Sequence, residues 1–83
     1  MYLSTLVETP QHLGDVVRRA RKALSLPQPQ LALAAGVGVR FIVDLEAGKP
    51  TVRLENVLRV LQALGTTLAV TGLDDCEQQG TQT

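Results

Sequence analysis

The sequence predicts a mainly α-helical domain of four or five short helices, followed by one short C-terminal β-strand that pairs across a dimer. Three observations support this prediction. Apolar residues recur every three or four positions in several segments, which is the period of an amphipathic helix. Glycine and proline residues separate these segments. One segment near the C-terminus is rich in β-branched residues and is too short to form a further helix.

The length of the chain limits it to a single domain of modest stability. A domain of 83 residues buries only about 60 to 65% of the surface of its unfolded chain, so a partner subunit would stabilise it. Hydrophobic residues make up 45% of the sequence and charged residues 19%, as expected for a globular domain with an aliphatic core. We assign residues 1–73 to this domain and the polar, acidic residues 74–83 to a disordered tail.

The first predicted helix begins at Pro10. Thr9 is suited to the N-cap position, and proline is favoured in the first turn. The apolar residues that recur at helical spacing are Leu13, Val16, Val17, Ala20 and Leu24. Four basic residues lie mainly on the polar side near the C-terminal end, where cations suit the helix dipole: Arg18, Arg19, Arg21 and Lys22. They form either a solvated basic face or a set of phosphate contacts.

Two short helices separated by a glycine turn come next. Pro27 and Pro29 can lie only before or within the first turn of the second helix, and Gly36 can end that helix in the left-handed conformation. The third helix starts near Val37 and stops at Gly48. Its inward residues are predicted to be Phe41, Ile42 and Leu45, and its more exposed residues Val39, Arg40, Val43 and Asp44.

The fourth helix is predicted from about Leu54 to Leu64, with Gly65 as its cap. Its apolar stripe contains Leu54, Val57, Leu58, Leu61 and Leu64. Residues 66–71 form the predicted strand. A lone strand leaves its backbone groups unpaired, so it needs a partner, which is either the segment 2–7 or the same strand of a second subunit.

Residues 26–50 resemble the DNA-binding motif of the Xre/Cro helix-turn-helix family, whose fold is lambda-repressor-like. The matching features are the leucine and glutamine that open the second helix, the Leu31-Ala32 pair, the Ala35-Gly36-Val37 turn, and the isoleucine, leucine, glutamate and glycine of the third helix. The resemblance extends over about residues 13–71. Helical periodicity and the glycine turn indicate the same two-helix unit independently.

Two positions depart from the family pattern. Pro27 and Gly38 stand where the family commonly has a serine or threonine cap, so both helix starts are expected to lack a side-chain acceptor.

Other positions resemble the HipB-type antitoxin branch of this family: Gly38, Phe41-Ile42, residues 48–54 and the strand-like residues 68–70. This resemblance implies four helices and a C-terminal strand that pairs across a dimer. It also implies a HipA-type serine/threonine kinase toxin as a partner, and autorepression of a toxin–antitoxin operon.

The distribution of charge favours DNA as a partner. The formal net charge is zero, but the segment from Asp15 to Arg59 contains all eight basic residues and only four acidic ones. In a helix-turn-helix, N-terminal residues of the second helix of the motif reach base edges in the major groove. Arginine can form two hydrogen bonds with guanine, and valine can pack against a thymine methyl group. The candidate base contacts are therefore Gly38, Val39, Arg40 and Val43, although both valines could instead extend the core.

Further residues are candidates for the DNA backbone. Arg18, Lys22 and Lys49 can bind phosphate or remain solvated surface charges. Gln28 resembles the family glutamine that touches the DNA backbone and braces the side chains that contact bases. We expect a structural role for Glu46, because its carboxylate would repel phosphate unless paired, and Arg18 or Arg19 could be the partner.

The predicted dimer contact consists of Thr67, Leu68, Ala69, Val70 and Leu61. A two-fold axis between the paired strands would place two recognition helices on one face of the DNA. The operator is therefore expected to be an inverted repeat.

Several functional classes are disfavoured. The sequence shows no nucleophile–base pair and no phosphate-cradling glycine loop, so we do not expect an enzyme. With one cysteine, Cys76, and one histidine, His12, we expect no metal site and no cofactor. The chain has no signal-like or membrane-spanning run, which predicts a cytoplasmic protein. Two alternatives remain open: an interaction module that neutralises a toxin with little DNA binding, and a free-standing phage-type repressor.

Overall fold

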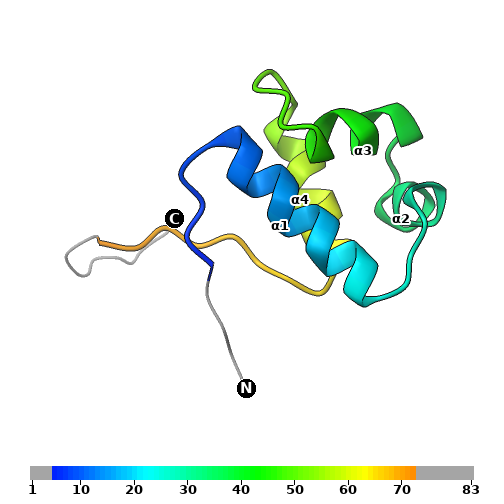
Figure 1. Ribbon diagram of the computed structural model, residues 1–83, viewed down its shortest axis with the longest axis horizontal. Helices are drawn as coiled ribbons and strands as arrows, with labels where there is room; N and C mark the ends of the chain where they lie inside the picture. Colours follow the sequence, from blue (N-terminus) through cyan, green and yellow to red (C-terminus); the bar gives the residue numbers. More distant parts are fainter. Residues whose placement is uncertain (1–4, 73–83) are drawn as a thin grey trace.

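Four helices make up the secondary structure of residues 5–72, the part of the chain that the computed structural model describes (Figure 1). They are α1 (Pro10–Ala23), α2 (Gln28–Ala35), α3 (Val39–Glu46) and α4 (Leu54–Ala63). Each coincides with a helix expected from the apolar periodicity, which confirms the mainly helical fold. None of the helices in this range is long and apolar enough to cross a membrane.

The helix boundaries follow local backbone chemistry. Thr9 caps α1, because its Oγ1 accepts a hydrogen bond of 3.0 Å from the backbone N–H of His12. As expected, the N-cap residues Pro27 of α2 and Gly38 of α3 provide no side-chain acceptor. Gly36 ends α2 with φ of +73°, a left-handed conformation that glycine adopts without steric cost.

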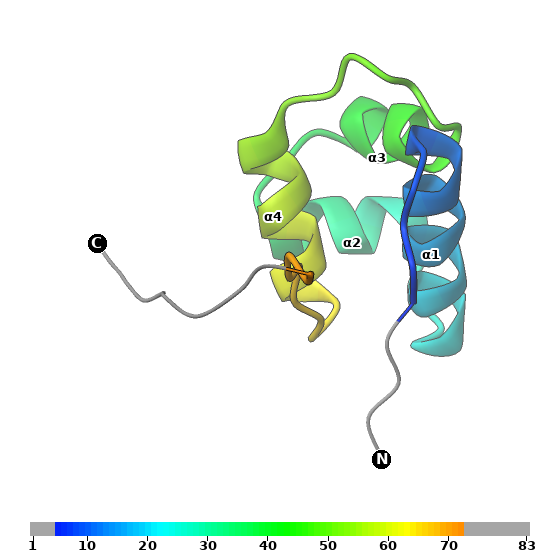
Figure 2. The same cartoon turned by 90° about the vertical axis from the view of Figure 1, so that its left-hand side faces the viewer.

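The helices pack around one aliphatic core. α1 packs against α3, and α2 packs against both α3 and α4. Figure 2 shows α1 and α4 on opposite sides of the bundle, with α2 between them and α3 across one end. The fully buried side chains come from all four helices and include Val17, Leu31, Ile42 and Val60. This arrangement holds α3 at the edge of the bundle, with one face turned inward.

The apolar stripe of α4 is only partly inside this core. Val57, Val60 and Leu61 are buried, whereas Leu54 and Leu58 are exposed. The apolar stripe predicted from the sequence is therefore covered only in part in the single subunit. The cause is that α4 packs on α2, which covers the face centred on Val60.

Residues 66–71 follow α4 without forming a strand with any other part of the described chain. Thr66 closes the end of α4, where its backbone N–H and its Oγ1 both donate to the carbonyl oxygen of Leu61, at 2.9 and 2.8 Å. A strand exists only where a partner completes its hydrogen bonds, and the single subunit provides none within residues 5–72. The predicted tail 74–83 and part of the segment 2–7 lie outside the described residues.

Candidate nucleic-acid interface

The turn between α2 and α3 fixes the angle at which α3 leaves the bundle. Only residues 36–38 connect the two helices, and the backbone N–H of Val37 donates to the carbonyl oxygen of Ala32 at 3.0 Å. The inner face of α3 is anchored by Ile42 and Leu45, both buried in the core. α3 is therefore held rigidly against α2 and α1.

The outer face of α3 is open to solvent. Val39, Arg40, Val43 and the following Ala47 are exposed, and the side chain of Asp44 is partly exposed. These residues fall on one side of the helix because positions three, four and seven apart share a face. The face is apolar at three positions and charged at two.

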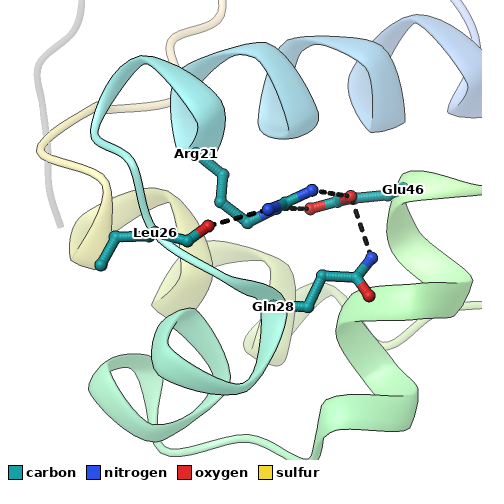
Figure 3. Close-up of polar contacts among 4 residues, drawn as sticks. All are labelled: Arg21, Leu26, Gln28 and Glu46. Carbon is teal, nitrogen blue, oxygen red and sulfur yellow. Dashed lines mark hydrogen bonds and ion pairs between the residues drawn. The ribbon is translucent and has the colours of Figure 1, made fainter.

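A buried ion pair joins α1 to α3 (Figure 3). Arg21 Nε donates to Glu46 Oε2 at 2.6 Å, and Arg21 Nη2 donates to Glu46 Oε1 at 3.0 Å. The two side chains are only 10% and 5% exposed. The third nitrogen, Nη1, donates to the carbonyl oxygen of Leu26 at 2.8 Å, and Gln28 Nε2 donates to Glu46 Oε1 at 3.1 Å. One carboxylate and one guanidinium thus tie α1, the α1–α2 linker, the start of α2 and the end of α3 together.

The pKa of Arg21 is raised above its ordinary value, chiefly by the hydrogen bonds to Glu46, which outweigh the opposite effect of burial. Because the pKa of this base is higher in the folded state than in the unfolded state, its charged form stabilises the fold at every pH below the unfolded-state pKa. This stabilisation is lost only as the pH rises through the folded-state pKa. Both values lie far above neutrality. The guanidinium therefore remains charged at any physiological pH.

The expectation that Arg18 or Arg19 pairs with Glu46 is wrong. Arg21 lies four residues after the buried Val17 and seven after the buried Gly14, so its side chain points to the inside of the bundle. Arg19 lies on another side of α1 and pairs with Asp15 at 2.8 Å in solvent. The position of Arg21 four residues after Val17 was the signal in the sequence that could have indicated this role.

A polar hollow of about 380 Å³ lies over the buried ion pair. It is bordered by α1, the start of α2 and the outer face of α3, and its lining residues are Arg18, Arg21, Lys22, Gln28, Val43, Glu46 and Ala47. Arg18 and Lys22 are exposed at its rim and form no ion pair within residues 5–72. Two free cations beside a helix N-terminus can bind a phosphate group.

Residues 17–70 match the helix-turn-helix protein family. The chain is also 53% identical over 64 residues to the uncharacterized HTH-type transcriptional regulator y4mF of Sinorhizobium fredii, an alignment that covers 77% of this chain and 84% of the relative. The chain belongs to the Xre-type helix-turn-helix family of transcriptional regulators. In this family α2 and α3 form the helix-turn-helix, and α3 is the recognition helix.

Solved structures share the fold of this Xre-type protein. One is a chain in a structure described as a HipA-HipB-O2-O3 complex, and another is a chain in a structure described as a HipB-O4 20mer complex. In both, the TM-score is 0.77 at 18% identity, with 86% of this chain and 100% of the other chain covered. At this level of identity the similarity concerns the fold alone.

The remaining candidates for DNA contact lie along the recognition helix. Gly38 is its N-cap, and Arg40 lies in its first turn. Lys49 follows the helix, and its Nζ lies 3.6 Å from Asp44 Oδ2. Arg40 Nε lies 3.3 Å from Asp44 Oδ1, so Asp44 connects both cations. The spacing of four residues between Arg40 and Asp44 is the signal in the sequence that indicates this ion pair.

The residues predicted for dimerisation divide into two groups. Leu61 is 5% exposed and belongs to the subunit's own core. Leu68 and Val70 are 50% and 78% exposed, and Thr67 and Ala69 are exposed as well. Leu68 also lines an apolar pocket of about 310 Å³ with Val7, Leu13, Val52, Leu54 and Val57, among others.

Proposed function

We propose that this Xre-type protein represses transcription by binding a short operator as a homodimer. The observation that carries the proposal is the position of the outer face of α3, next to a polar hollow bordered by the exposed cations Arg18 and Lys22. An α-helix of this kind fits the major groove, and cations beside it neutralise the flanking phosphates. The buried pair of Arg21 and Glu46 keeps the recognition helix and the hollow in a fixed relation.

The first turn of α3 supplies the proposed base contacts. Arg40 can bind the O6 and N7 atoms of guanine with two hydrogen bonds. Val39 and Val43 keep accessible surface, which favours contact with thymine methyl groups over a purely structural role. Gly38 has no side chain, and no atom of any described residue other than Gly38 and its two chain neighbours lies within 4 Å of the place where a Cβ would be, so the backbone can approach the DNA closely.

The proposed phosphate contacts are Arg18, Lys22, Gln28 and Lys49. Three of them border the polar hollow, which supports a common phosphate position there. The Gln28 amide donates a hydrogen bond to Glu46, which restricts the motion of the Gln28 side chain. Gln28 therefore loses less conformational entropy when it binds a phosphate. Lys49 lies beyond the C-terminal end of the recognition helix and would contact a separate phosphate.

We further propose that Thr67, Leu68, Ala69 and Val70 pair with the same residues of a second subunit. Antiparallel pairing would supply the missing backbone hydrogen bonds and cover the exposed Leu68 and Val70. Leu61 is almost fully buried and can contribute little surface to a dimer contact. Leu54 and Leu58 of α4 are exposed, so a second subunit can cover them. Two recognition helices would then lie about 34 to 36 Å apart, or a multiple of this distance.

A HipA-type kinase toxin is the proposed protein partner. This rests on the resemblance to HipB-type antitoxins and on the shared fold with a chain in a structure described as a HipA-HipB-O2-O3 complex. Copurification from the native host with a kinase-like protein encoded next to this gene would support it. An operon without such a gene, together with no copurifying protein, would favour a free-standing repressor instead.

Selection of binding sites from a random duplex pool tests the proposed function. We expect the full-length protein to enrich an inverted repeat whose half-site centres are separated by about 10 base pairs or a multiple of this distance. Enrichment of no sequence would contradict specific DNA binding and would favour the interaction-module alternative.

A further inference from the structure

The recognition helix carries one charged side chain, Asp44, that the proposed DNA contacts do not explain. The carboxylate of Asp44 lies between two cations: Arg40 Nε is 3.3 Å from one oxygen, and Lys49 Nζ is 3.6 Å from the other. A carboxylate on the face that meets DNA repels phosphate. Its presence there suggests a role that offsets this repulsion.

Asp44 is the fixed member of this group. Its side chain is 22% exposed, compared with 86% for Arg40 and 59% for Asp15, a carboxylate that pairs with an arginine at the same spacing on α1. The backbone also holds Lys49 beside it, because the N–H of Lys49 donates to the carbonyl oxygen of Asp44 at 3.0 Å. Arg40, in contrast, extends into solvent and touches the protein mainly through this ion pair.

We propose that Asp44 is a positioning residue that orients Arg40 for guanine and thereby determines sequence specificity. This inference rests on the proposed function, in particular on base contact by Arg40. The ion pair includes Nε of Arg40, which lies 3.3 Å from Asp44 Oδ1, and the Arg40 side chain remains 86% exposed. The terminal nitrogens Nη1 and Nη2 form a fork that matches the O6 and N7 acceptors of guanine. Contact with Asp44 therefore restrains the guanidinium while most of the Arg40 side chain stays accessible to a base.

Asp44 then has two opposite effects on DNA binding. Its negative charge weakens binding to every sequence, because it offsets one of the two neighbouring cations. Its contact with Arg40 strengthens binding only where a guanine meets the fork, because the side chain loses less freedom when it binds. Loss of Asp44 should therefore tighten non-specific binding and reduce discrimination at the same time.

The test compares Asp44→Ala with Asp15→Ala, which removes the same charge and the same type of ion pair from α1. The dissociation constant of each full-length protein is measured on the selected site, on that site with the guanine replaced, and on a shuffled duplex. For Asp44→Ala we expect binding to the shuffled duplex to become about 2- to 5-fold tighter. We expect the preference for guanine to fall by about 5- to 30-fold, part of what a full guanine–arginine contact provides. Asp15→Ala should leave the preference unchanged.

Two further variants separate orientation from charge and from misfolding. Asp44→Asn keeps an acceptor oxygen but loses the charge, so it should bind the shuffled duplex as tightly as Asp44→Ala while keeping more of the preference. Arg40→Ala/Asp44→Ala should show the same preference as Arg40→Ala. Thermal unfolding midpoints of all variants confirm that the fold is intact.

Equal tightening of Asp44→Ala on all three duplexes would overturn the inference and leave the proposed function standing, since Arg40 would then contact guanine without help from Asp44. If Arg40→Ala itself keeps the guanine preference, the base contact proposed for Arg40 fails, and this inference fails with it.

Discussion

Arg40 and Lys22 are both proposed to contact DNA, but their substitutions are expected to change DNA binding in different ways. Arg40→Ala should weaken binding to the selected site by about 1 to 3 kcal/mol and relax the preference at one base position. Lys22→Ala should weaken binding to all sequences alike and reduce the slope of log affinity against log salt by about one. Titration of matched and mismatched duplexes at several salt concentrations measures both effects. A sequence-selective effect of Lys22→Ala would show that the two roles are exchanged.

Glu46 is expected to matter for stability more than any exposed carboxylate. Glu46→Ala leaves the Arg21 guanidinium buried without its partner, which should cost about 3 to 5 kcal/mol of the free energy of unfolding. Glu55→Ala is the control, because it breaks the exposed pair with Arg59 and should cost less than about 1 kcal/mol. The free energy of unfolding in urea is measured for the unmodified protein, for Glu46→Ala and for Glu55→Ala. Equal losses in the two variants would contradict a structural role for the buried pair.

Reasoning from the sequence predicted the structural role of Glu46 but assigned the wrong partner. A structural role is expected for Glu46 because an unpaired carboxylate there would repel the phosphates of DNA. The choice among the arginines of α1 depends on which side of the helix faces the core, and four basic residues within five positions cover almost every side. Arginine is rarely buried unless it is paired, and the partner of Arg21 becomes visible only when α3 is in place.

At the level of helices, the contact between α1 and α3 depends on Gly14. A Cβ at this position would lie 2.5 Å from the carbonyl oxygen of Leu45 and 2.9 Å from that of Glu46, and these backbone atoms cannot move aside. Gly14→Ala should therefore destabilise the fold by about 1 to 3 kcal/mol, even though alanine favours helix by about 1 kcal/mol. The measurement is the free energy of unfolding in urea.

Gly38→Ala is the matched control for Gly14→Ala. No atom of another described residue, beyond the two chain neighbours, lies within 4 Å of a Cβ placed at Gly38, and its φ of −76° suits any residue, so we expect a change of less than about 1 kcal/mol. A stable Gly14→Ala variant would mean that α1 and α3 can separate without loss, which would contradict the tight packing described for them.

The helices could be predicted from the sequence, whereas the C-terminal strand could not be established from it. Thr9 and Gly36 act through local chemistry, so their effects on the helix ends follow from a few neighbouring residues. Pairing of residues 66–71 depends instead on a partner outside the local sequence. Leu54 is exposed for a similar reason. The sequence predicts that it lies on the apolar stripe of α4, but its burial depends on which other element or subunit covers that stripe.

For the whole molecule, the proposed dimer should depend on Leu68. Leu68→Asp places a charge in the proposed interface and should reduce both dimerisation and operator affinity while leaving the helical core intact. Val70→Pro should act similarly, because proline removes a backbone donor from the pairing. Leu33→Asp is the control, since Leu33 is an exposed leucine on α2. Sedimentation measures the dimer, and circular dichroism measures the helix content.

A dimer that persists in both Leu68→Asp and Val70→Pro would show that this segment is not the interface. Pairing of residues 66–71 with the segment 2–7 inside one subunit would then be the better account. Loss of the dimer in Leu33→Asp as well would point to an interface that includes α2.

The most direct test of sequence-specific DNA binding is the ratio of two dissociation constants. Fluorescence anisotropy of the selected inverted repeat and of a shuffled duplex of the same length, at the same salt concentration, gives both values for the unmodified protein. We expect the inverted repeat to bind about 10³-fold more tightly or better, the range in which specific regulators exceed their own non-specific binding. Equal affinity for the two duplexes would contradict the account, because charge alone would then explain all binding to DNA.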